Sequence, residues 1–264
     1  MHCPFTSIAG LLDGPVEEMA RHLDLLVPDA LRRLFGLPEP GRWGNQAAGV
    51  HRWSPGPRPG TLRVEVWPAP EGEDPALALD LADHQFGKLE AAWIALNDVE
   101  QPRYDLDRDA RGGPIPLGSI ERNLAEERRA LADGLAPNQV RPGLRMFRPL
   151  IRCLEEFAVC LGADTLNVVP LAYHNAIQYE RYGFTYASEE VELEEIHRRF
   201  QPGGDLRARM DGSTPFRLPA MGGTVRGRSW AIHDGILGRR WVPPPMYKFT
   251  ERDFHTCTFP GAVW

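Results

Sequence analysis

Apolar side chains recur at helical spacing in several stretches of the chain. The clearest is residues 149–161, where the apolar positions form one continuous stripe. Residues 16–26 and 30–35 repeat the pattern near the start of the chain, and residues 119–133 repeat it after Ser119, a residue type that caps helices. The spacing therefore predicts amphipathic helices in all of these stretches.

Other stretches show the alternation or the short apolar runs that are typical of β-strands. Residues 62–67 alternate apolar and charged side chains, and residues 89–96 form an apolar run that predicts a strand buried on both faces, although so short a run also fits a helix. Further strands are predicted over residues 76–81, 165–169 and 185–193. The Asp234-Gly235 step within residues 230–237 predicts a hairpin. Together these elements predict a mixed α/β (α+β) fold.

Gly and Pro mark the segments between these elements. Outside the strand at 62–67, residues 38–75 contain eight prolines and read as loop, as do the acidic residues 97–118. Residues 195–264 hold 16 Gly plus Pro and nine aromatic residues. So many large apolar side chains favour packing over a free tail, so we expect a C-terminal extension that packs on the preceding domain.

The charge balance argues against two classes of partner. The chain has 30 Lys plus Arg and 36 Asp plus Glu, a formal net charge of −6, which suits neither nucleic acid nor an anionic membrane surface. The longest uncharged stretch, residues 165–179, spans 15 residues and contains Asn, His and Gln, so no membrane span is predicted. Because no signal-peptide pattern opens the sequence, we expect a cytoplasmic protein.

Cysteine and histidine give no metal pattern. The four cysteines form no C-x-x-C pair and are interpreted as reduced thiols, in keeping with the cytoplasm. Glu194 and His197 have a Glu-x-x-His spacing, but a di-iron bundle needs two such pairs. His233, His255 and Cys257 lie in the C-terminal extension without a spacing that requires a metal. We therefore expect no metal.

One short segment points to a chemistry. Asn175 opens a predicted short helix after the strand at 165–169, Tyr179 follows four residues later, and Gly183-Phe184 end the helix. This segment resembles the second half of the GNAT superfamily of acyltransferases. The resemblance covers roughly residues 139–186 and implies a mixed, mostly antiparallel central sheet with flanking helices. It also implies that Asn175 binds the pantetheine arm of an acyl donor and that Tyr179 protonates the leaving thiolate. The structural alternatives are a helix cap for Asn175 and an interior hydroxyl for Tyr179.

The same family wraps the pyrophosphate of coenzyme A with a Gln/Arg-x-x-Gly-x-Gly/Ala loop before the long helix. Here the corresponding residues are Gln139, Arg141, Gly143 and Arg145. Pro142 removes one backbone donor, and no second small residue follows Gly143. The two arginines can replace the lost donors by side-chain charge, or they can simply be surface residues.

The resemblance also implies a general base on the strand before this loop. Glu90 and Asp98 flank the strand at 89–96 and are the candidates, although solvated surface carboxylates are the common alternative. The resemblance further implies a GNAT-like domain over residues 1–194, with an insertion at about 98–138.

The expected function follows from the resemblance. It is transfer of an acyl group from acyl-coenzyme A, or from the pantetheine of an acyl carrier protein, to a small-molecule or peptide amine. The alternative is a non-catalytic protein of the same fold that binds a ligand or partner. The sequence leaves open whether the chain forms a homo-oligomer.

Overall fold

The computed structural model describes residues 4–37, 50–69, 71–84, 87–116, 119–188 and 191–264. The chain folds into two compact units, and each unit is assembled from three segments. The first unit comprises Met1–Glu100, Gly143–Val168 and Tyr247–Asp253, and the second comprises Gln101–Pro142, Val169–Met246 and Phe254–Trp264.

The strands form a seven-stranded, mostly antiparallel sheet in the order β1-β2-β3-β4-β5-β7-β6. The strands are β1 (His51–Pro55), β2 (Thr61–Val66), β3 (Leu77–His84), β4 (Lys88–Leu96), β5 (Thr165–Val168), β6 (Thr185–Tyr186) and β7 (Met246–Phe249). The first four strands pair in antiparallel fashion in chain order, whereas β4 and β5 are parallel. This confirms the mixed α/β class with a mostly antiparallel sheet.

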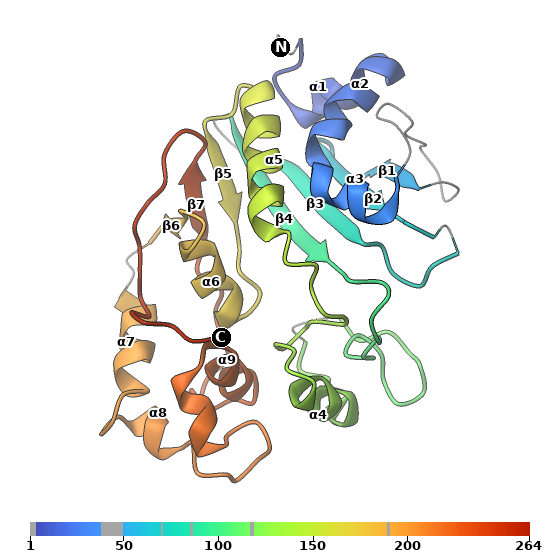
Figure 1. Ribbon diagram of the computed structural model, residues 1–264. Coiled ribbons are helices and arrows are strands. Elements are labelled where there is room, and N and C mark those ends of the chain that lie inside the picture. The colour runs from blue at the N-terminus through green and yellow to red at the C-terminus, as the bar shows by residue number, and fades with distance from the viewer. Residues whose placement is uncertain (1–3, 38–49, 70, 85–86, 117–118, 189–190) are drawn as a thin grey trace. The chain divides into compact units, whose positions relative to one another are not determined.

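The helices of the first unit lie on one side of its strands (Figure 1). They are α1 (Ile8–Leu12), α2 (Val16–Leu23), the 3₁₀ helix η1 (Asp24–Leu26), α3 (Asp29–Phe35) and α5 (Phe147–Cys160). Register places Val64 of β2 opposite Leu79 of β3, and both are fully buried. The stripe of α5 supplies Leu154 and Phe157, which are also fully buried. The spacing of apolar residues in the sequence therefore predicted this core correctly. The apolar faces of the strands and of the helix α5 are the faces that are buried.

Strand β4 departs from its prediction in its second half. The register with β3 shifts by one residue, so that Asp80 faces Trp93 while Leu81 faces Ala91, and Ala92 is left as a β-bulge. Ala92 is exposed and the four residues after it are only half-buried, so the expectation of burial on both faces is wrong there. Pairing with β5 ends at the same point, because its last partners are Ala91 and Val168.

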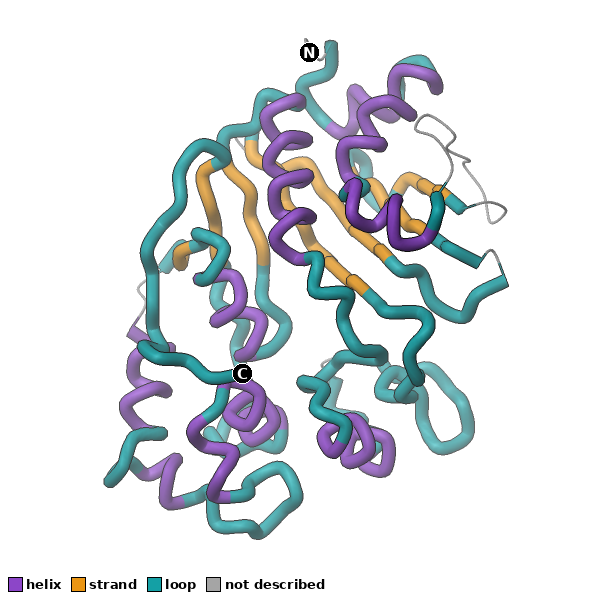
Figure 2. The backbone as a smooth tube through the Cα atoms, viewed as in Figure 1, coloured by secondary structure: helices purple, strands orange, loops and turns teal. Residues whose placement is uncertain are grey.

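The second unit consists mainly of short helices and long loops (Figure 2). Its helices are α4 (Leu124–Ala132), α6 (Tyr173–Glu180), α7 (Val191–Arg199), α8 (Asp205–Ala208), the 3₁₀ helix η2 (Pro219–Gly223) and α9 (Val225–His233). Phe216 and Trp230 stack with ring centroids 5.2 Å apart at the centre of one core. The Trp230 indole N–H donates to the Leu135 carbonyl at 2.8 Å, which ties α9 to the segment after α4.

Two sequence predictions are wrong in this unit. Residues 225–233 form helix α9 rather than the first strand of a hairpin, because Thr224 caps the helix and Gly235 follows it with a φ of +80°. An Asp-Gly step serves a helix end as well as a hairpin turn, so that signal is ambiguous. Of the predicted strand at 185–193, Thr185–Tyr186 form β6 and residues from Val191 onward are helical, while residues 189–190 lie outside the described residues.

Candidate functional site

The predicted site residues fall into both units. Glu90, Asp98, Gly143 and Arg145 belong to the first unit, and Asn175, Tyr179, Gln139 and Arg141 belong to the second. The structure brings Asn175 and Tyr179 together on helix α6, one turn apart.

Tyr179 lies near the end of α6 and is 8% exposed. Its ring packs against Phe184, with centroids 5.1 Å apart. Burial raises the pKa of the Tyr179 phenol well above its usual range, so the hydroxyl keeps its proton and is a weaker acid than a solvated phenol.

Asn175 occupies the third position of α6 and reaches back to the helix start. Its Oδ1 accepts a hydrogen bond from the Ala172 backbone N–H at 3.0 Å, which satisfies a donor that the helix leaves unpaired. This contact also fixes the amide orientation, so that Nδ2 faces His174 Nε2 at 3.2 Å. Asn175 therefore has a capping role, exerted from within the first turn rather than from the N-cap position.

His174 and Ser229 form a buried pair that sequence reasoning did not find. His174 Nδ1 lies 2.9 Å from Ser229 Oγ, and the His174 backbone N–H lies 3.3 Å from the same oxygen. Because Asn175 donates to Nε2, the proton of the neutral ring is on Nδ1, and the imidazole donates to the serine. Burial lowers the pKa of His174 to about 3. A serine nucleophile needs an imidazole that accepts its proton, so this pair has the polarity of a structural contact.

The loop before α5 uses part of its predicted anion-binding set for internal contacts. Gln139 Oε1 accepts the Ala136 backbone N–H at 2.7 Å, and Arg141 Nη1 donates to the Gln101 carbonyl at 2.5 Å. Arg145 is exposed and has a φ of +57°, a conformation that costs a non-glycine residue about 1–2 kcal/mol.

Gly143 and the start of α5 complete this loop. Gly143 is exposed, and a methyl group in its place would meet the Leu96 carbonyl oxygen at 3.5 Å, an ordinary contact. Packing in the protein therefore does not explain the glycine. Helix α5 has no side-chain cap and no acidic residue in its first turn, so its positive end is not neutralised locally.

The two candidate bases flank β4. Glu90 is half-buried and lies opposite Asn167 of the parallel strand β5. Asp98 follows the end of β4, and its Oδ1 accepts the Glu100 backbone N–H at 3.2 Å.

Glu180 is a buried carboxylate that no sequence signal marked. It is 6% exposed, and it accepts hydrogen bonds from the Tyr186 hydroxyl, the Thr258 backbone N–H at 3.0 Å and the Thr258 hydroxyl at 2.6 Å. Phe254 N–H also donates to the Gly183 carbonyl at 3.0 Å. These bonds fasten the C-terminal segment to the end of α6, because three donors converge on one desolvated carboxylate.

A second buried carboxylate, Glu127 of α4, joins α4 to α9. It pairs with the Arg122 guanidinium and lies 2.8 Å from His233 Nε2, while Arg122 also pairs with Asp234 at 3.1 Å. Burial works against ionisation of Glu127, but the hydrogen bonds from His233 and Arg122 outweigh it and lower the Glu127 pKa. His233 therefore has the Glu127 carboxylate as its hydrogen-bond partner.

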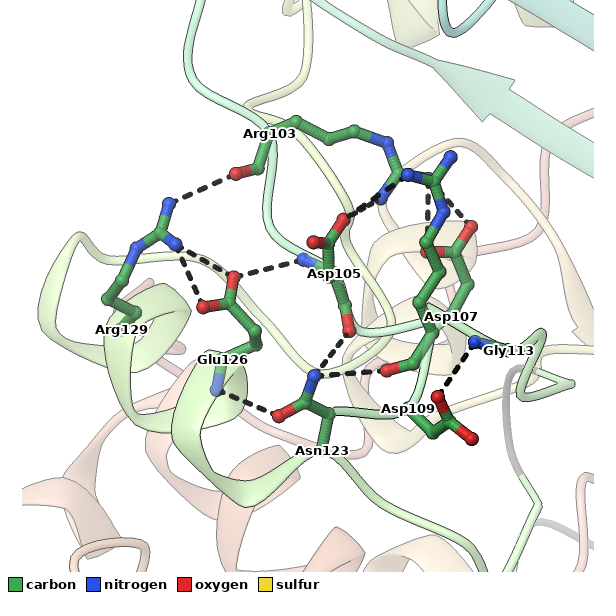
Figure 3. A network of polar contacts seen from close by, with 9 residues as sticks. Arg103, Asp105, Asp107, Asp109, Gly113, Asn123, Glu126 and Arg129 are labelled. Atoms are coloured by element: carbon green, nitrogen blue, oxygen red, sulfur yellow. Dashed lines mark hydrogen bonds and ion pairs between the residues drawn. The ribbon is translucent and has the colours of Figure 1, made fainter. Parts of the chain in front are cut away.

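The acidic segment that begins the second unit is held by a polar network (Figure 3). Arg103 pairs with Asp105 at 2.6 Å and with Asp107 at 2.8 Å. Asn123 Nδ2 donates to the Asp105 and Arg108 carbonyls at 3.2 and 3.0 Å. These carboxylates and carbonyls already have donors, so the network shapes the segment.

Helix α4 (Leu124–Ala132) and its cap Asn123 continue the same network. Glu126 accepts a hydrogen bond from the Asp105 backbone N–H at 3.0 Å and pairs with Arg129 at 2.8 Å. Arg129 in turn donates to the Arg103 carbonyl (Figure 3). The helix begins at Leu124 with Asn123 as its cap, four residues later than the predicted cap at Ser119.

Among the residues that the structure describes, no group of three or more His, Cys, Asp or Glu side chains is arranged to hold a metal ion. No helix in the described part of the chain is long and apolar enough to cross a membrane. Cys153, Cys160 and Cys257 are free thiols, and Cys3 lies outside the described residues.

Comparison of the chain with protein-family models, with curated proteins and with solved structures finds no match in any of the three.

Proposed function

We propose that the chain is a GNAT-like acyltransferase that moves an acyl group from a pantetheine thioester to an amine. The donor is acyl-coenzyme A or the pantetheine of an acyl carrier protein. The succession of α5, β5, α6 and β6 along the chain, with both strands in one sheet, supports this proposal, because it is the order in which the family builds its coenzyme A half.

The observation that carries the proposal is the end of pairing between β4 and β5. The two strands run parallel from Leu89 to Ala91, and the bulge at Ala92 bends β4 where the pairing stops. On its β5 side, no described strand pairs with Ala92–Leu96, so that edge can hydrogen-bond an extended ligand. A pantetheine arm is extended and carries amide groups, and it fits such an edge.

The chemistry would be direct attack. The amine nitrogen adds to the thioester carbonyl, a tetrahedral intermediate forms, and its collapse breaks the carbon–sulfur bond. The resemblance gives the role of proton donor to Tyr179. It gives the role of base to a carboxylate beside the strand before the loop, for which Glu90 and Asp98 are the candidates. Most of the acceleration would come from holding the two reactants together.

A non-catalytic binding protein is the second candidate, and specific contacts favour it. The side chains of Gln139, Arg141 and Asn175 are already engaged within the protein, and Tyr179 is buried. Residues that serve the fold in this way are less available to a substrate.

Two measurements on the full chain separate these functions. Coenzyme A, acyl-coenzyme A and free pantetheine should each raise the melting temperature, since a ligand that binds only the native state stabilises it. Acyl-coenzyme A plus a panel of amines should then release thiol. Stabilisation without release would favour the binding protein, and the absence of both would contradict the two proposals.

A charge-reversal pair sharpens the donor assignment. Arg145→Glu should weaken coenzyme A binding but leave pantetheine binding unchanged, because only coenzyme A carries the pyrophosphate. Arg152→Glu is the matched control, since Arg152 is exposed in the second turn of α5. If the two variants change coenzyme A binding equally, the loop does not bind the pyrophosphate.

A further inference from the structure

Arg228 on helix α9 is a buried cation without a carboxylate partner. The residue is 2% exposed. Its Nε donates to the Gly222 carbonyl at 2.8 Å, and its Nη1 donates to His197 Nδ1 at 3.1 Å. No carboxylate of the described chain lies within ion-pair distance of the guanidinium. Buried charges are normally paired, so this position calls for an explanation.

Aromatic rings surround the guanidinium instead. Its central carbon lies 3.7 Å from the centroid of the Phe259 ring and 5.0 Å from that of Phe200. Ring faces attract a cation but do not neutralise it. Burial lowers the pKa of Arg228 from its ordinary value, as expected for a charge removed from water.

Two further buried groups have a donor without an acceptor, one on Tyr173 beside Arg228 and one on Trp241 beside Tyr173. Tyr173 is 1% exposed, and its hydroxyl makes no hydrogen bond of normal geometry within the described residues, although the Arg228 guanidinium is close enough to act on it as a donor. A guanidinium can only donate, so the hydroxyl proton has no acceptor. The indole N–H of Trp241 is likewise unpartnered within that part of the chain. The two rings meet edge to face, with centroids 6.1 Å apart. Burial raises the pKa of Tyr173 to about 12, and the nearby charge of Arg228 opposes that rise, so the hydroxyl lies close to the guanidinium.

We propose that Arg228, Tyr173 and Trp241 form a binding site for a small monocarboxylate. The carboxylate would pair with the guanidinium and accept hydrogen bonds from the Tyr173 hydroxyl and the Trp241 indole N–H. All three groups are donors, so the ligand must be an acceptor. A carboxylate meets an arginine in the bidentate geometry that the guanidinium favours.

The charge around the site selects a monoanion. One guanidinium balances one negative charge, and the buried carboxylate of Glu180 is close enough to raise the pKa of Tyr173 further. A dianion such as phosphate would carry a second, unbalanced charge into a desolvated site. The aromatic surroundings in turn suit a carboxylate attached to an apolar group.

Trp241 is half-buried and Val242 beside it is 60% exposed, so this end of the site reaches the surface.

The proposal does not depend on acyl transfer, and the full chain tests it directly. Benzoate is the probe, benzamide is its neutral counterpart, and inorganic phosphate is the dianion. The readout is the indole N–H resonance of Trp241, which a Trp241→Phe variant identifies. Benzoate should move this resonance to lower field and reach saturation, whereas benzamide and phosphate should leave it in place.

Two conservative variants complete the test. Tyr173→Phe removes a hydrogen bond to a charged ligand and should weaken benzoate binding about tenfold or more. Arg228→Lys keeps the positive charge but loses the paired N–H donors of the guanidinium, so it should also weaken benzoate binding. Arg226→Lys is the control, because Arg226 is exposed on the same helix, and it should leave benzoate binding unchanged. The proposal is overturned if benzoate gives no saturable shift, if benzamide gives the same shift, or if both variants bind as the native chain does. If benzoate gives no saturable shift, water would be what satisfies the buried donors.

Discussion

The two units each bury a cation, and the two cations differ in their partners. In the first unit Lys248 is 3% exposed and pairs with Glu155 at 2.9 Å and with Asp253. In the second unit Arg228 is equally buried, yet its contacts are a carbonyl, a histidine and two aromatic rings. Lys248 has the partners that a structural charge requires. Arg228 does not, so a ligand is a more natural partner for it.

The interiors around these cations also differ. The core of the first unit is largely apolar and follows from strands and helices whose apolar faces meet. The second unit buries the charged side chains of Glu127, Glu180 and Arg228, with His174 and Ser229 beside them. Local departures from an apolar interior are where function is expected, because they cost stability unless something uses them.

The largest effect should come from the apolar core. Phe157→Ala removes a fully buried ring from α5 and should lower the free energy of unfolding by about 3–5 kcal/mol in urea titrations. Val159→Ala, on the same helix but 54% exposed, is the control and should change it by less than about 0.5 kcal/mol. Similar losses for the two variants would mean that α5 does not anchor the first unit.

A smaller effect is expected at the carboxylate that holds the C-terminal segment. Glu180→Gln replaces charge-assisted hydrogen bonds from Tyr186 and Thr258 and should cost about 1.5–3 kcal/mol. Hydrogen exchange should show faster exchange in Phe254–Trp264. Glu194→Gln on the exposed side of α7 should leave that segment unchanged, and unchanged protection in both variants would contradict the role of Glu180.

The third effect appears as a dependence on pH. The unfolded chain protonates His174 near pH 6.5, whereas burial lowers the folded pKa to about 3. The contribution of His174 to stability is therefore complete above pH 6.5 and declines as the pH falls, by about 1.4 kcal/mol per unit until pH 3. His174→Gln should flatten the decline, and His255→Gln, at an exposed histidine, should not. An identical slope in all three proteins would refute the assignment.

The sequence predicted the first unit well because its signals are local. Helix α5 was predicted within two residues at its start, and strands β2 to β4 within three residues at each end. Strand β1 was missed because prolines surround it, and helix α9 was missed because its short apolar run fits a strand or a helix.

The candidate site was only partly predictable for a physical reason. Asn175 and Tyr179 were placed on one short helix by the pattern that carries the family resemblance. The contacts of Glu180 with Thr258 span 78 residues, and those of His174 with Ser229 span 55. The spacing of apolar residues along the chain carries no information about contacts between residues so far apart in the sequence. The burial of Arg228 could not be predicted either, because an arginine is usually expected at the surface.

The catalytic step of the acyl-transfer proposal depends most directly on Tyr179, and the Tyr179→Phe variant tests it by removing only the phenolic hydroxyl. The measurement is thiol release from acyl-coenzyme A in the presence of an amine that the native chain accepts, alongside the melting temperature. If Tyr179 protonates the leaving thiolate, the rate should fall by at least about a hundredfold, since a positioned proton donor contributes roughly 10²–10⁴. The melting temperature and donor affinity should then hardly change. An unchanged rate with a stability loss of about 1 kcal/mol would show instead that the hydroxyl serves the interior.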